Sequence, residues 1–577
     1  MRLRVSASPW PVVPVNAVPV IYVSGGVPSQ PPAAAVLSRA PAGKAVGRGM
    51  ASSRGEYAAG IRIQYTVWLV SLCNRESTMS TTTPTLIKHQ MYIDGRFVEP
   101  AGGQFFESDH PYTGEPWALI PRGNAEDVDR AVRAAHAALT SGPWPKMTAT
   151  QRGALLRKLG DLVAANARDL AALEVRDNGK LFAEMNGQLN YIPQWYYYYG
   201  GLADKIEGSV IPTDKADMFN YTRYEPVGVV GMIIPWNSPL LLTSWKLAPA
   251  LAAGNTVVIK PSEFTSASAL AFVRLVEQAG FPPGVVNIVT GFGADVGSPL
   301  VEHPLVAKVA FTGSDATGQK VYEAAARGLK RVTMELGGKS PNIVFDDAEI
   351  DNAVKGVISG IFAATGQTCI AGSRLLVQQS IHDQFLEKLV AFAKTARMGD
   401  PMSSETQVGP VTNKPQLEKI LKYIDIAKSE GAQAVLGGAR AVRPECGNGW
   451  FVEPTIFAGV NNRMRIAQEE VFGPVLSVIP FKDEEEAVSI GNDVVFGLAA
   501  GVWTQNMRRA LMMADRLQAG TVWVNTYRAV SVLSPFGGYK RSGLGRENGQ
   551  DMIKEYMQTK SVWISTATEV PNPFVMR

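Results

Sequence analysis

Short, almost uninterrupted apolar runs alternate with helical patterns over most of the chain. Four runs have the length and composition of strands that are covered on both faces: 227–234, 256–259, 285–289 and 306–311. Helical stretches such as 266–278 separate these runs. The alternation predicts βαβ units around an open parallel sheet, and in such sheets ligands bind beyond the carboxyl ends of the strands.

The same pattern continues on both sides of these runs. Asn124 followed by Asp127 indicates a capped helix start, and apolar residues follow at helical spacing. A second α/β block is predicted from about 338 to 540, with a strand at 341–345 and a helix around 385–393. The stretch 556–564 is predicted to be an isolated strand without a local partner, which favours pairing with another subunit.

Composition narrows the class of protein. Apolar residues make up 46% of the 577 residues and charged residues 19%, which excludes a disordered or fibrous chain and predicts two or three domains. The formal net charge is +4, but residues 1–78 hold eight Lys and Arg against two acidic residues, so residues 79–577 carry −2. This near-neutral body gives no reason to expect nucleic acid as a partner. We therefore interpret the aromatic run 195–199 as core and interface packing.

Residues 1–78 differ from the rest of the chain, with eight prolines and no acidic residue before Glu56. We expect a disordered extension outside the fold, with the functional start at Met79. An organellar transit peptide is the alternative, whereas prolines interrupt the apolar stretch 10–23 too often for a secretory signal. The apolar stretch 63–73 is shorter than the ~20 residues that cross a bilayer, so no membrane role is predicted.

Cysteine and histidine positions indicate neither a disulfide framework nor a metal site. Cys73, Cys369 and Cys446 share no C-x-x-C spacing, and the five histidines form no H-E-x-x-H motif. We therefore expect no metal, and we expect reduced thiols in a cytoplasmic protein.

Glycine-rich turns follow two of the predicted strands, at 291–297 and 313–318. The first has one residue too many for the G-x-G-x-x-G fingerprint, so neither turn alone is a strong sign of phosphate binding. Lys260 and Glu263 stand where a strand ends and a helix begins. Their side chains could hydrogen-bond the hydroxyls of a ribose, or they could form an exposed surface pair.

Six longer motifs are more specific, in chain order PWNSP at 235–239, FTGS at 311–314, MELGGKSP at 334–341, GQTCIAGSR at 366–374, EVFGP at 470–474 and PFGGYKRSG at 535–543. Together they resemble the aldehyde dehydrogenase superfamily, and the resemblance covers roughly residues 85–566. It implies an α/β fold with a variant Rossmann domain, a second α/β catalytic domain and a small oligomerisation strand element.

The implied domain organisation has three parts after the extension. An NAD-binding domain at 79–338, with bridging strands at about 208–226, precedes a catalytic domain at 339–540. A C-terminal segment at 541–577 carries the oligomerisation strand at about 556–566. A homodimer or homotetramer is expected.

The resemblance also implies roles for three residues. Removing hydride from an aldehyde requires a tetrahedral carbon, and Cys369 resembles the nucleophile that adds to the carbonyl. A free thiol is mostly protonated at pH 7, so it needs activation by dipoles or a base. The Asn237 amide, with the backbone N–H of Cys369, resembles the oxyanion hole. Glu335 resembles the general base for hydrolysis of the thioester, and burial would raise its pKa usefully.

The presence of Glu335 separates two reactions. Acylating relatives, which pass the thioester to coenzyme A, typically lack this glutamate, so hydrolytic oxidation of an aldehyde to the carboxylic acid is predicted. A coenzyme-A-acylating semialdehyde dehydrogenase is the enzymatic alternative. The alternative from another class is a non-catalytic binding or structural protein on the same fold. It is disfavoured because each position that the reaction requires holds a residue of the matching type.

The implied cofactor is NAD. The residues that match cofactor-binding positions of the family are Ile234, Pro235, Trp236, Lys260, Ser262, Glu263, Gly293, Gly297, Phe311, Gly313, Ser314, Leu336, Glu470 and Phe472. A carboxylate at Glu263 would repel a 2′-phosphate, so NAD is preferred, with NADP as a possible secondary cofactor.

The resemblance implies a small-molecule aldehyde as the substrate. The residues that match the family's aldehyde tunnel are Ser238, Leu242, Trp245, Tyr527 and Arg528. Ser238 is small where relatives often carry an aromatic residue, which would widen the tunnel. Arg528 could pair with a substrate carboxylate, which would indicate a semialdehyde, or it could face solvent or a subunit contact.

Overall fold

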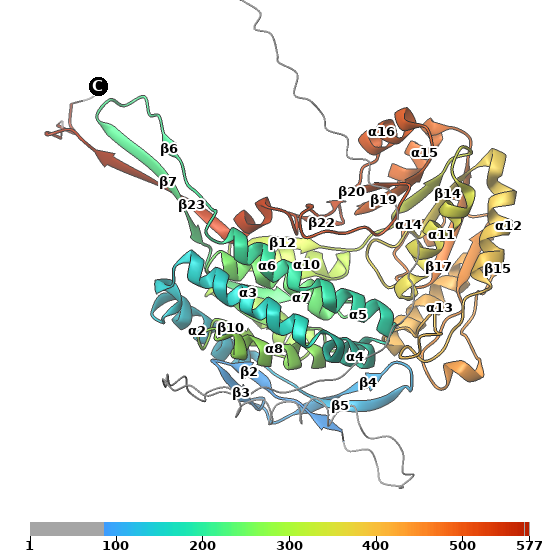
Figure 1. Ribbon diagram of the computed structural model, residues 1–577, viewed down its shortest axis with the longest axis horizontal. Helices are drawn as coiled ribbons and strands as arrows, with labels where there is room; N and C mark the ends of the chain where they lie inside the picture. Colours follow the sequence, from blue (N-terminus) through green and yellow to red (C-terminus); the bar gives the residue numbers. More distant parts are fainter. Residues whose placement is uncertain (1–85, 571, 576–577) are drawn as a thin grey trace, which may run out of the picture. The chain divides into compact units, whose positions relative to one another are not determined.

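Two open and mostly parallel sheets organise the chain (Figure 1). The computed structural model describes residues 86–570 and 572–575, all within the unit Thr78–Arg577. The interpretation of residues 1–78 as an extension and the position of Cys73 lie outside the described residues. No helix in the described part of the chain is long and apolar enough to cross a membrane.

The first sheet has eight strands, in spatial order β22 (Gly543–Leu544), β12 (Arg331–Glu335), β11 (Val306–Thr312), β8 (Val229–Ile233), β9 (Thr256–Lys260), β10 (Val286–Ile288), β2 (Met91–Ile93) and β3 (Arg96–Val98). The strands from β12 to β10 are parallel, and the four predicted runs are β8, β9, β10 and β11. Strands β22, β2 and β3 are antiparallel to their neighbours.

Helices cover both faces of the first sheet, which is why its strands are apolar at nearly every position. Val229 and Val258 pack on one face against α2 (Ala125–Thr140), α9 (Ser298–Glu302) and α10 (Asp315–Arg327). Val230 and Val257 point to the other face, against α7 (Pro239–Ala252) and α8 (Ala267–Ala279). A further layer lies on α7 and α8 and contains α3 (Ala149–Ala165), α4 (Ala167–Asn178), α5 (Phe182–Tyr191) and α6 (Pro193–Leu202).

Two of the local predictions in this half are confirmed. Asn124 caps α2, and its side chain and that of Asp127 form the reciprocal capping box. Within the aromatic run on α6, the rings of Trp195, Tyr196 and Tyr199 are completely buried in the core, as the packing interpretation requires.

The second sheet has seven strands, in spatial order β15 (Gln433–Leu436), β16 (Thr455–Ala458), β17 (Val475–Phe481), β14 (Arg374–Gln378), β13 (Pro341–Val344), β19 (Ala499–Trp503) and β20 (Thr521–Val524). All except β15 are parallel. Its helices are α11 (Ile350–Ile361), α12 (His382–Ala393), α13 (Lys414–Ser429), α14 (Arg465–Gln468), α15 (Glu484–Asn492) and α16 (Met507–Arg516). The chain passes from the first sheet to the second at residues 336–340, between β12 and β13.

Strand β23 (Met557–Ser565) corrects the expectation of a tail strand without a partner in its own chain. It pairs antiparallel with β7 (Met218–Pro226) along its whole length, and β7 also pairs with β6 (Val210–Ile211) (Figure 1). The partner lies far away in the sequence, so the local pattern could not indicate it. Within the described residues, β23 has a neighbouring strand on one edge only.

The remaining strands form two small sheets. One contains β1 (Ile87–Lys88), β5 (Glu115–Pro121) and β4 (Phe105–His110), and the other contains β18 (Phe496–Gly497) and β21 (Tyr539–Lys540).

Candidate active site

The residues of the predicted site lie between the two sheets, where the carboxyl edge of the first sheet faces the amino edge of the second. Glu335 is the last residue of β12, and Asn237 follows β8, so both lie at the carboxyl edge of the first sheet. Cys369 precedes β14, at the amino edge of the second sheet. The Asn237 amide donates a hydrogen bond across this junction to the carbonyl of Gln367, at 3.0 Å.

The turn before Cys369 has an unusual backbone that the sequence did not indicate. Ala364, Thr365 and Gly366 all have positive φ, between 52° and 68°. A side chain at Gly366 would overlap the carbonyl oxygen of Gly473, so only glycine fits this close approach. The Gln367 side-chain oxygen accepts a hydrogen bond from the backbone N–H of Thr412 at 3.0 Å. These contacts hold the backbone that carries the sulfur.

The Cys369 thiol is half-buried, and burial raises its pKa to about 12. The carboxylates of Glu335 and Glu470 add to this rise, because a nearby negative charge disfavours a thiolate. The thiol is therefore protonated at neutral pH in the protein without bound ligands. A base must accept its proton when it acts as a nucleophile.

Glu335 lies in an almost completely buried position, and its Oε2 atom has no hydrogen-bond partner among the described residues. Burial is the main cause that raises the pKa of Glu335 well above its ordinary value, and the negative charge of Glu547 adds to it. Lys246 pairs with Glu547 at 2.6 Å, and both side chains are fully buried. The charge of Lys246 acts in the opposite direction and lowers the pKa of Glu335. Sequence reasoning missed this pair.

Two of the predicted cofactor residues face each other at the end of β9. The Lys260 ammonium pairs with the Glu263 carboxylate at 3.0 Å, and Lys260 is buried while Glu263 is partly exposed. The lysine is therefore paired, and the pair is not fully exposed to solvent. Ser262 between them is buried, and its Oγ accepts a hydrogen bond from the N–H of Phe264.

The first glycine turn, at 293–297, leaves room for a ligand beside the sheet. Gly293 and Gly297 begin and end a π-helical turn after β10, and a methyl group added at either would meet no atom within 4 Å. Ser314 caps α10 directly after β11, and its Oγ accepts from the N–H of Thr317. The N–H of Gly313 bonds the carbonyl of Glu335 at 3.1 Å, so this turn is tied to the end of β12. Open space, strand ends and helix starts here fit a dinucleotide.

Other predicted cofactor residues gather around the chain crossing at 336–340. Trp236 and Phe472 stack edge to face, with ring centroids 5.1 Å apart. The Glu470 carboxylate accepts a hydrogen bond from the N–H of Gly338 at 2.9 Å, and burial raises its pKa to about 7. The N–H of Leu336 bonds the carbonyl of Ser542.

The remaining cofactor positions lie at the ends of the central strands. Phe311 is buried near the end of β11, and Ile234 donates its N–H to the carbonyl of Lys260 just beyond β8. Pro235 follows Ile234 and is half-buried.

The predicted substrate residues come from two directions. Ser238, Leu242 and Trp245 are buried on α7 or at its start, and Trp245 lies against the rings of Trp195 and Phe536. Tyr527 donates its hydroxyl to the carbonyl of Ile370, next to the nucleophile, at 3.0 Å.

Arg528 and Lys180 are cationic residues of this region. Arg528 is half-buried and reaches the carbonyl of Ser359 at 3.4 Å, so it does not simply face solvent. Sequence reasoning missed Lys180, whose buried ammonium donates to the Ser238 hydroxyl at 3.0 Å.

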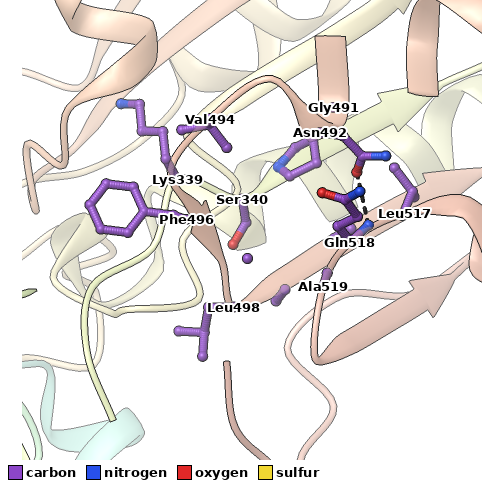
Figure 2. A pocket seen from close by; sticks show the side chains of 14 residues that line it. Lys339, Ser340, Gly491, Asn492, Val494, Phe496, Leu498, Leu517, Gln518 and Ala519 are labelled. Atoms are coloured by element: carbon purple, nitrogen blue, oxygen red, sulfur yellow. Dashed lines mark hydrogen bonds between the residues drawn. The ribbon is translucent and has the colours of Figure 1, made fainter. Parts of the chain in front are cut away.

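A small cavity elsewhere is not part of this site. Figure 2 shows that it is lined by the turn at 339–341, by residues of the segment 491–500 and by 517–519. The Asn492 side chain accepts a hydrogen bond from the N–H of Gln518 there, at 2.8 Å. None of the predicted site residues lines this cavity.

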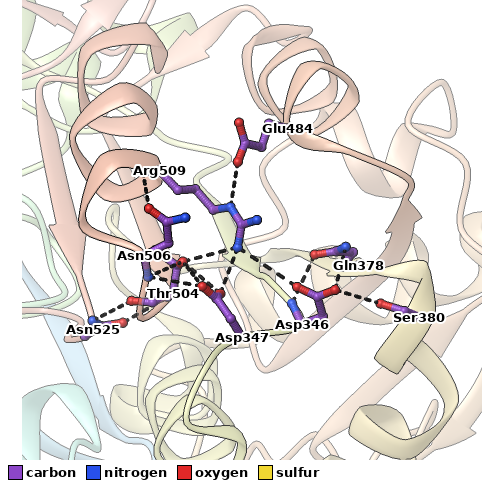
Figure 3. Close-up of polar contacts among 9 residues, drawn as sticks. All are labelled: Asp346, Asp347, Gln378, Ser380, Glu484, Thr504, Asn506, Arg509 and Asn525. Atoms are coloured by element: carbon purple, nitrogen blue, oxygen red, sulfur yellow. Dashed lines mark hydrogen bonds and ion pairs between the residues drawn. The ribbon is translucent and has the colours of Figure 1, made fainter.

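The carboxyl edge of the second sheet is closed by polar side chains. Arg509 on α16 pairs with Asp347 at 2.9 Å and with Glu484 at 2.7 Å, and the Thr504 hydroxyl donates to Asp347 (Figure 3). Asp347 follows β13 and Thr504 follows β19. Open sheets commonly bind ligands at their carboxyl edge. Here the polar side chains at that edge bond to one another instead.

Comparison with known proteins agrees with this geometry. A family model described as the aldehyde dehydrogenase family matches residues 97–562. The (Z)-2-((N-methylformamido)methylene)-5-hydroxybutyrolactone dehydrogenase of Acinetobacter baylyi is 47% identical over 491 residues, which are 85% of this chain and 99% of that protein. The human mitochondrial aldehyde dehydrogenase is 46% identical over 484 residues, which are 83% and 93% of the two chains. An aldehyde dehydrogenase from Bacillus cereus, solved as a complex with NAD+, matches with a TM-score of 0.81 and 45% identity over 83% of this chain and 97% of that one. The chain therefore belongs to the aldehyde dehydrogenase family.

Proposed function

We propose that the protein oxidises an aldehyde to the carboxylic acid with NAD, through a thioester on Cys369 that is then hydrolysed. One observation carries this proposal. In a chain of this family, the fold brings a thiol, a side-chain amide and a buried carboxyl to one junction between two sheets. Cys369, Asn237 and Glu335 come from distant parts of the sequence, and each has the chemistry that one step requires.

The first step is addition of the Cys369 sulfur to the aldehyde carbon. The nucleophile is the thiolate, so the proton of the thiol passes to solvent as the carbon–sulfur bond forms. The Asn237 amide and the N–H of Cys369 then donate hydrogen bonds to the oxyanion of the thiohemiacetal. Removing one such donor typically costs about 2.7–4 kcal/mol of transition-state stabilisation.

The second part of the reaction is hydrolysis of the thioester. A buried carboxylate with a raised pKa is a stronger base than one in water, so Glu335 removes the proton of the attacking water. The acid is released and the thiol is restored. This use of Glu335 favours hydrolysis over transfer of the acyl group to coenzyme A.

Bound NAD supplies the acceptor for the hydride that leaves the tetrahedral carbon. Lys260 and Glu263 at the end of β9 would hold the adenosine ribose, and Ser314 with the turn at 293–297 would lie near the pyrophosphate. Glu470 and Phe472 would hold the nicotinamide end. The Glu263 carboxylate disfavours a 2′-phosphate, which makes NADP the secondary cofactor.

The assembly and location of the protein are part of the same proposal. The segment 79–338 would be the NAD-binding domain and 339–540 the catalytic domain. One edge of β23 has no neighbouring strand in the described part of the chain, which supports a homodimer or homotetramer in which this sheet meets another subunit. The free thiols of Cys369 and Cys446 support a cytoplasmic location.

The test is turnover of butanal by the purified chain with NAD, followed by NADH absorbance and by mass spectrometry of the product. We expect butyrate as the product, with or without added coenzyme A. Cys369→Ser should abolish turnover, and Cys446→Ser, at a buried thiol away from the site, is the matched control. Turnover that survives in Cys369→Ser, or butyryl-coenzyme A as the product, would overturn the proposal.

A further inference from the structure

Tyr527 is a buried tyrosine beside the nucleophile, and no step described above uses its hydroxyl. Only 9% of its surface is exposed. Its hydroxyl donates a hydrogen bond to the carbonyl of Ile370 at 3.0 Å, and Ile370 directly follows Cys369. Burial raises the pKa of Tyr527 above its ordinary value, so the hydroxyl keeps its proton and remains a donor.

Three glycines from separate segments leave a slot for the ring of Tyr527. A Cβ atom at Gly501 on β19 would lie 2.6 Å from the ring, and one at Gly360 on α11 would lie 3.3 Å from it. A Cβ atom at Gly372 would lie 2.9 Å from the hydroxyl oxygen. The ring also packs against Trp523 on β20, with centroids 4.8 Å apart. The slot therefore directs the hydroxyl at the turn that carries the nucleophile.

The loop that carries Tyr527 is fixed in an uncommon conformation. Asn525 and Arg528, on either side of it, have φ angles of 54° and 65°, which non-glycine residues seldom adopt. The Asn525 side chain accepts a hydrogen bond from the N–H of Thr504 at 3.0 Å and donates one to the carbonyl of Thr504 at 2.9 Å (Figure 3). This double contact holds the loop against the end of β19.

The hydrogen bond from Tyr527 completes the bonding of the turn after the nucleophile. The N–H of Ala371 bonds the carbonyl of Thr368, and the N–H of Gly372 bonds a carbonyl on α11, both at 3.0 Å. The carbonyl of Ile370, a buried residue, has no hydrogen-bond donor besides Tyr527 among the described residues. Without this hydroxyl, a buried carbonyl would be unpaired and Ile370 would be free to turn.

The orientation of Ile370 matters because its other backbone group faces the sulfur. The N–H groups of Cys369 and Ile370 lower the pKa of the thiol by hydrogen bonding to it. Burial and the carboxylates of Glu335 and Glu470 act in the opposite direction, and the Lys180 ammonium is the cation that interacts with the thiol. The two N–H groups therefore favour a thiolate at a position where burial opposes it.

We propose that Tyr527 is a positioning residue for the nucleophile, which holds the carbonyl of Ile370 so that the N–H of Ile370 stays directed at the sulfur of Cys369. The inference rests on the proposed function, in which this sulfur attacks the aldehyde. It gives Tyr527 a role other than lining the aldehyde tunnel. The competing interpretations are the tunnel wall and a purely structural hydrogen bond in the core.

The test is alkylation of Cys369 by iodoacetamide in the full chain, followed at several pH values by mass spectrometry of the peptide that contains this residue. Tyr527→Phe removes the hydroxyl and keeps the ring in its slot. We expect alkylation to become about 3- to 10-fold slower, the effect of losing one neutral hydrogen bond, and the whole profile to move to higher pH. With NAD and butanal, the burst of NADH should slow to a similar extent, while KM for NAD stays unchanged.

Tyr199→Phe is the matched control. Tyr199 is also buried, and its hydroxyl also donates to a backbone carbonyl, that of Gly549, at 3.0 Å. Both variants should lose a similar amount of stability in urea denaturation. Only Tyr527→Phe should change the alkylation of Cys369, which separates positioning of the thiol from a purely structural bond.

Alkylation of Tyr527→Phe at the wild-type rate would overturn the inference and leave the proposed function standing. A changed KM for the aldehyde with wild-type alkylation would assign Tyr527 to the tunnel wall and would overturn it too. A wild type that does not oxidise aldehydes would refute the proposed function, and the alkylation comparison would still report on the thiol.

A second variant decides the question if Tyr527→Phe does not fold. Asn525→Gly removes the side chain that holds the loop to Thr504 but accepts the positive φ at this position. Slower alkylation of Cys369 is again the expected result, because the loop that carries the hydroxyl is released. An unchanged alkylation rate in this variant would overturn the inference.

Discussion

Replacing Glu335 with glutamine removes the proposed base and keeps the shape of the side chain. Glu335 ends β12 in a buried position, where its Oε2 has no partner among the described residues. An amide of the same size fits this space, so the fold should persist. The amide cannot accept a proton, and hydrolysis of the thioester is therefore the step that should slow down.

The magnitude follows from general-base catalysis. A positioned base contributes about 10²- to 10⁴-fold to the rate, which corresponds to roughly 2.7–5.4 kcal/mol of activation free energy. The burial that raises the pKa of Glu335 favours a larger effect, because a stronger base contributes more. We expect the steady-state rate of Glu335→Gln to fall by about 100-fold or more.

The pH dependence follows from the same raised pKa. The base is the carboxylate, which becomes populated only as the pH rises through the pKa of Glu335. Hydrolysis in the wild type should therefore increase with pH over a range above the ordinary titration of a glutamate. In Glu335→Gln this increase should disappear.

Rapid mixing of enzyme, NAD and aldehyde measures the two steps separately. If Glu335 acts in hydrolysis, the variant should form one equivalent of NADH per active site in a burst and then continue slowly. Glu323→Gln, at an exposed glutamate on α10, is the matched control. An unchanged steady-state rate would remove Glu335 from the mechanism, and loss of the burst would place its role in the attack by Cys369.

Two further predictions concern buried or paired charges. Lys246→Met leaves Glu547 buried without its partner and should lower the free energy of unfolding by about 3–5 kcal/mol, and the double variant Lys246→Met/Glu547→Leu should recover most of this in urea denaturation. A single variant as stable as the wild type would contradict that expectation. Glu263→Ala frees Lys260 from its ion pair and should raise kcat/KM with NADP relative to NAD, as measured by the two coenzyme titrations. An unchanged ratio would show that Glu263 does not select the coenzyme.

Much of the first sheet could be predicted from the sequence, because its strands are marked by the apolar character of neighbouring residues. A strand buried on both faces needs apolar residues at successive positions, as Val229 and Val230 show by pointing to opposite helix layers. The start of α2 could be predicted equally well, because Asn124 and Asp127 form their capping box within one turn. Cys369, Asn237 and Glu335 were identified by their motifs and not by periodicity.

Contacts between distant segments could not be predicted in this way. The pairing of β23 with β7 joins Met557 to Pro226, and no local signal marks this register. Lys180 lies in a stretch with no distinctive motif, and its meaning depends on Ser238 beside it in space. The pair of Lys246 and Glu547 is also visible only once the tail has folded back onto α7.

The junction between the two sheets affects how a substitution far from the site can reduce activity. The sulfur is carried by the second sheet and most of the proposed coenzyme contacts by the first, while one apolar core contains residues of both. A cavity opened in that shared interior, for instance beneath Leu375, would shift donor and acceptor of the hydride relative to each other. Such a substitution would lower the rate of hydride transfer more than the affinity for the coenzyme. A core variant far from the site would therefore have the kinetics of a variant at the reacting atoms.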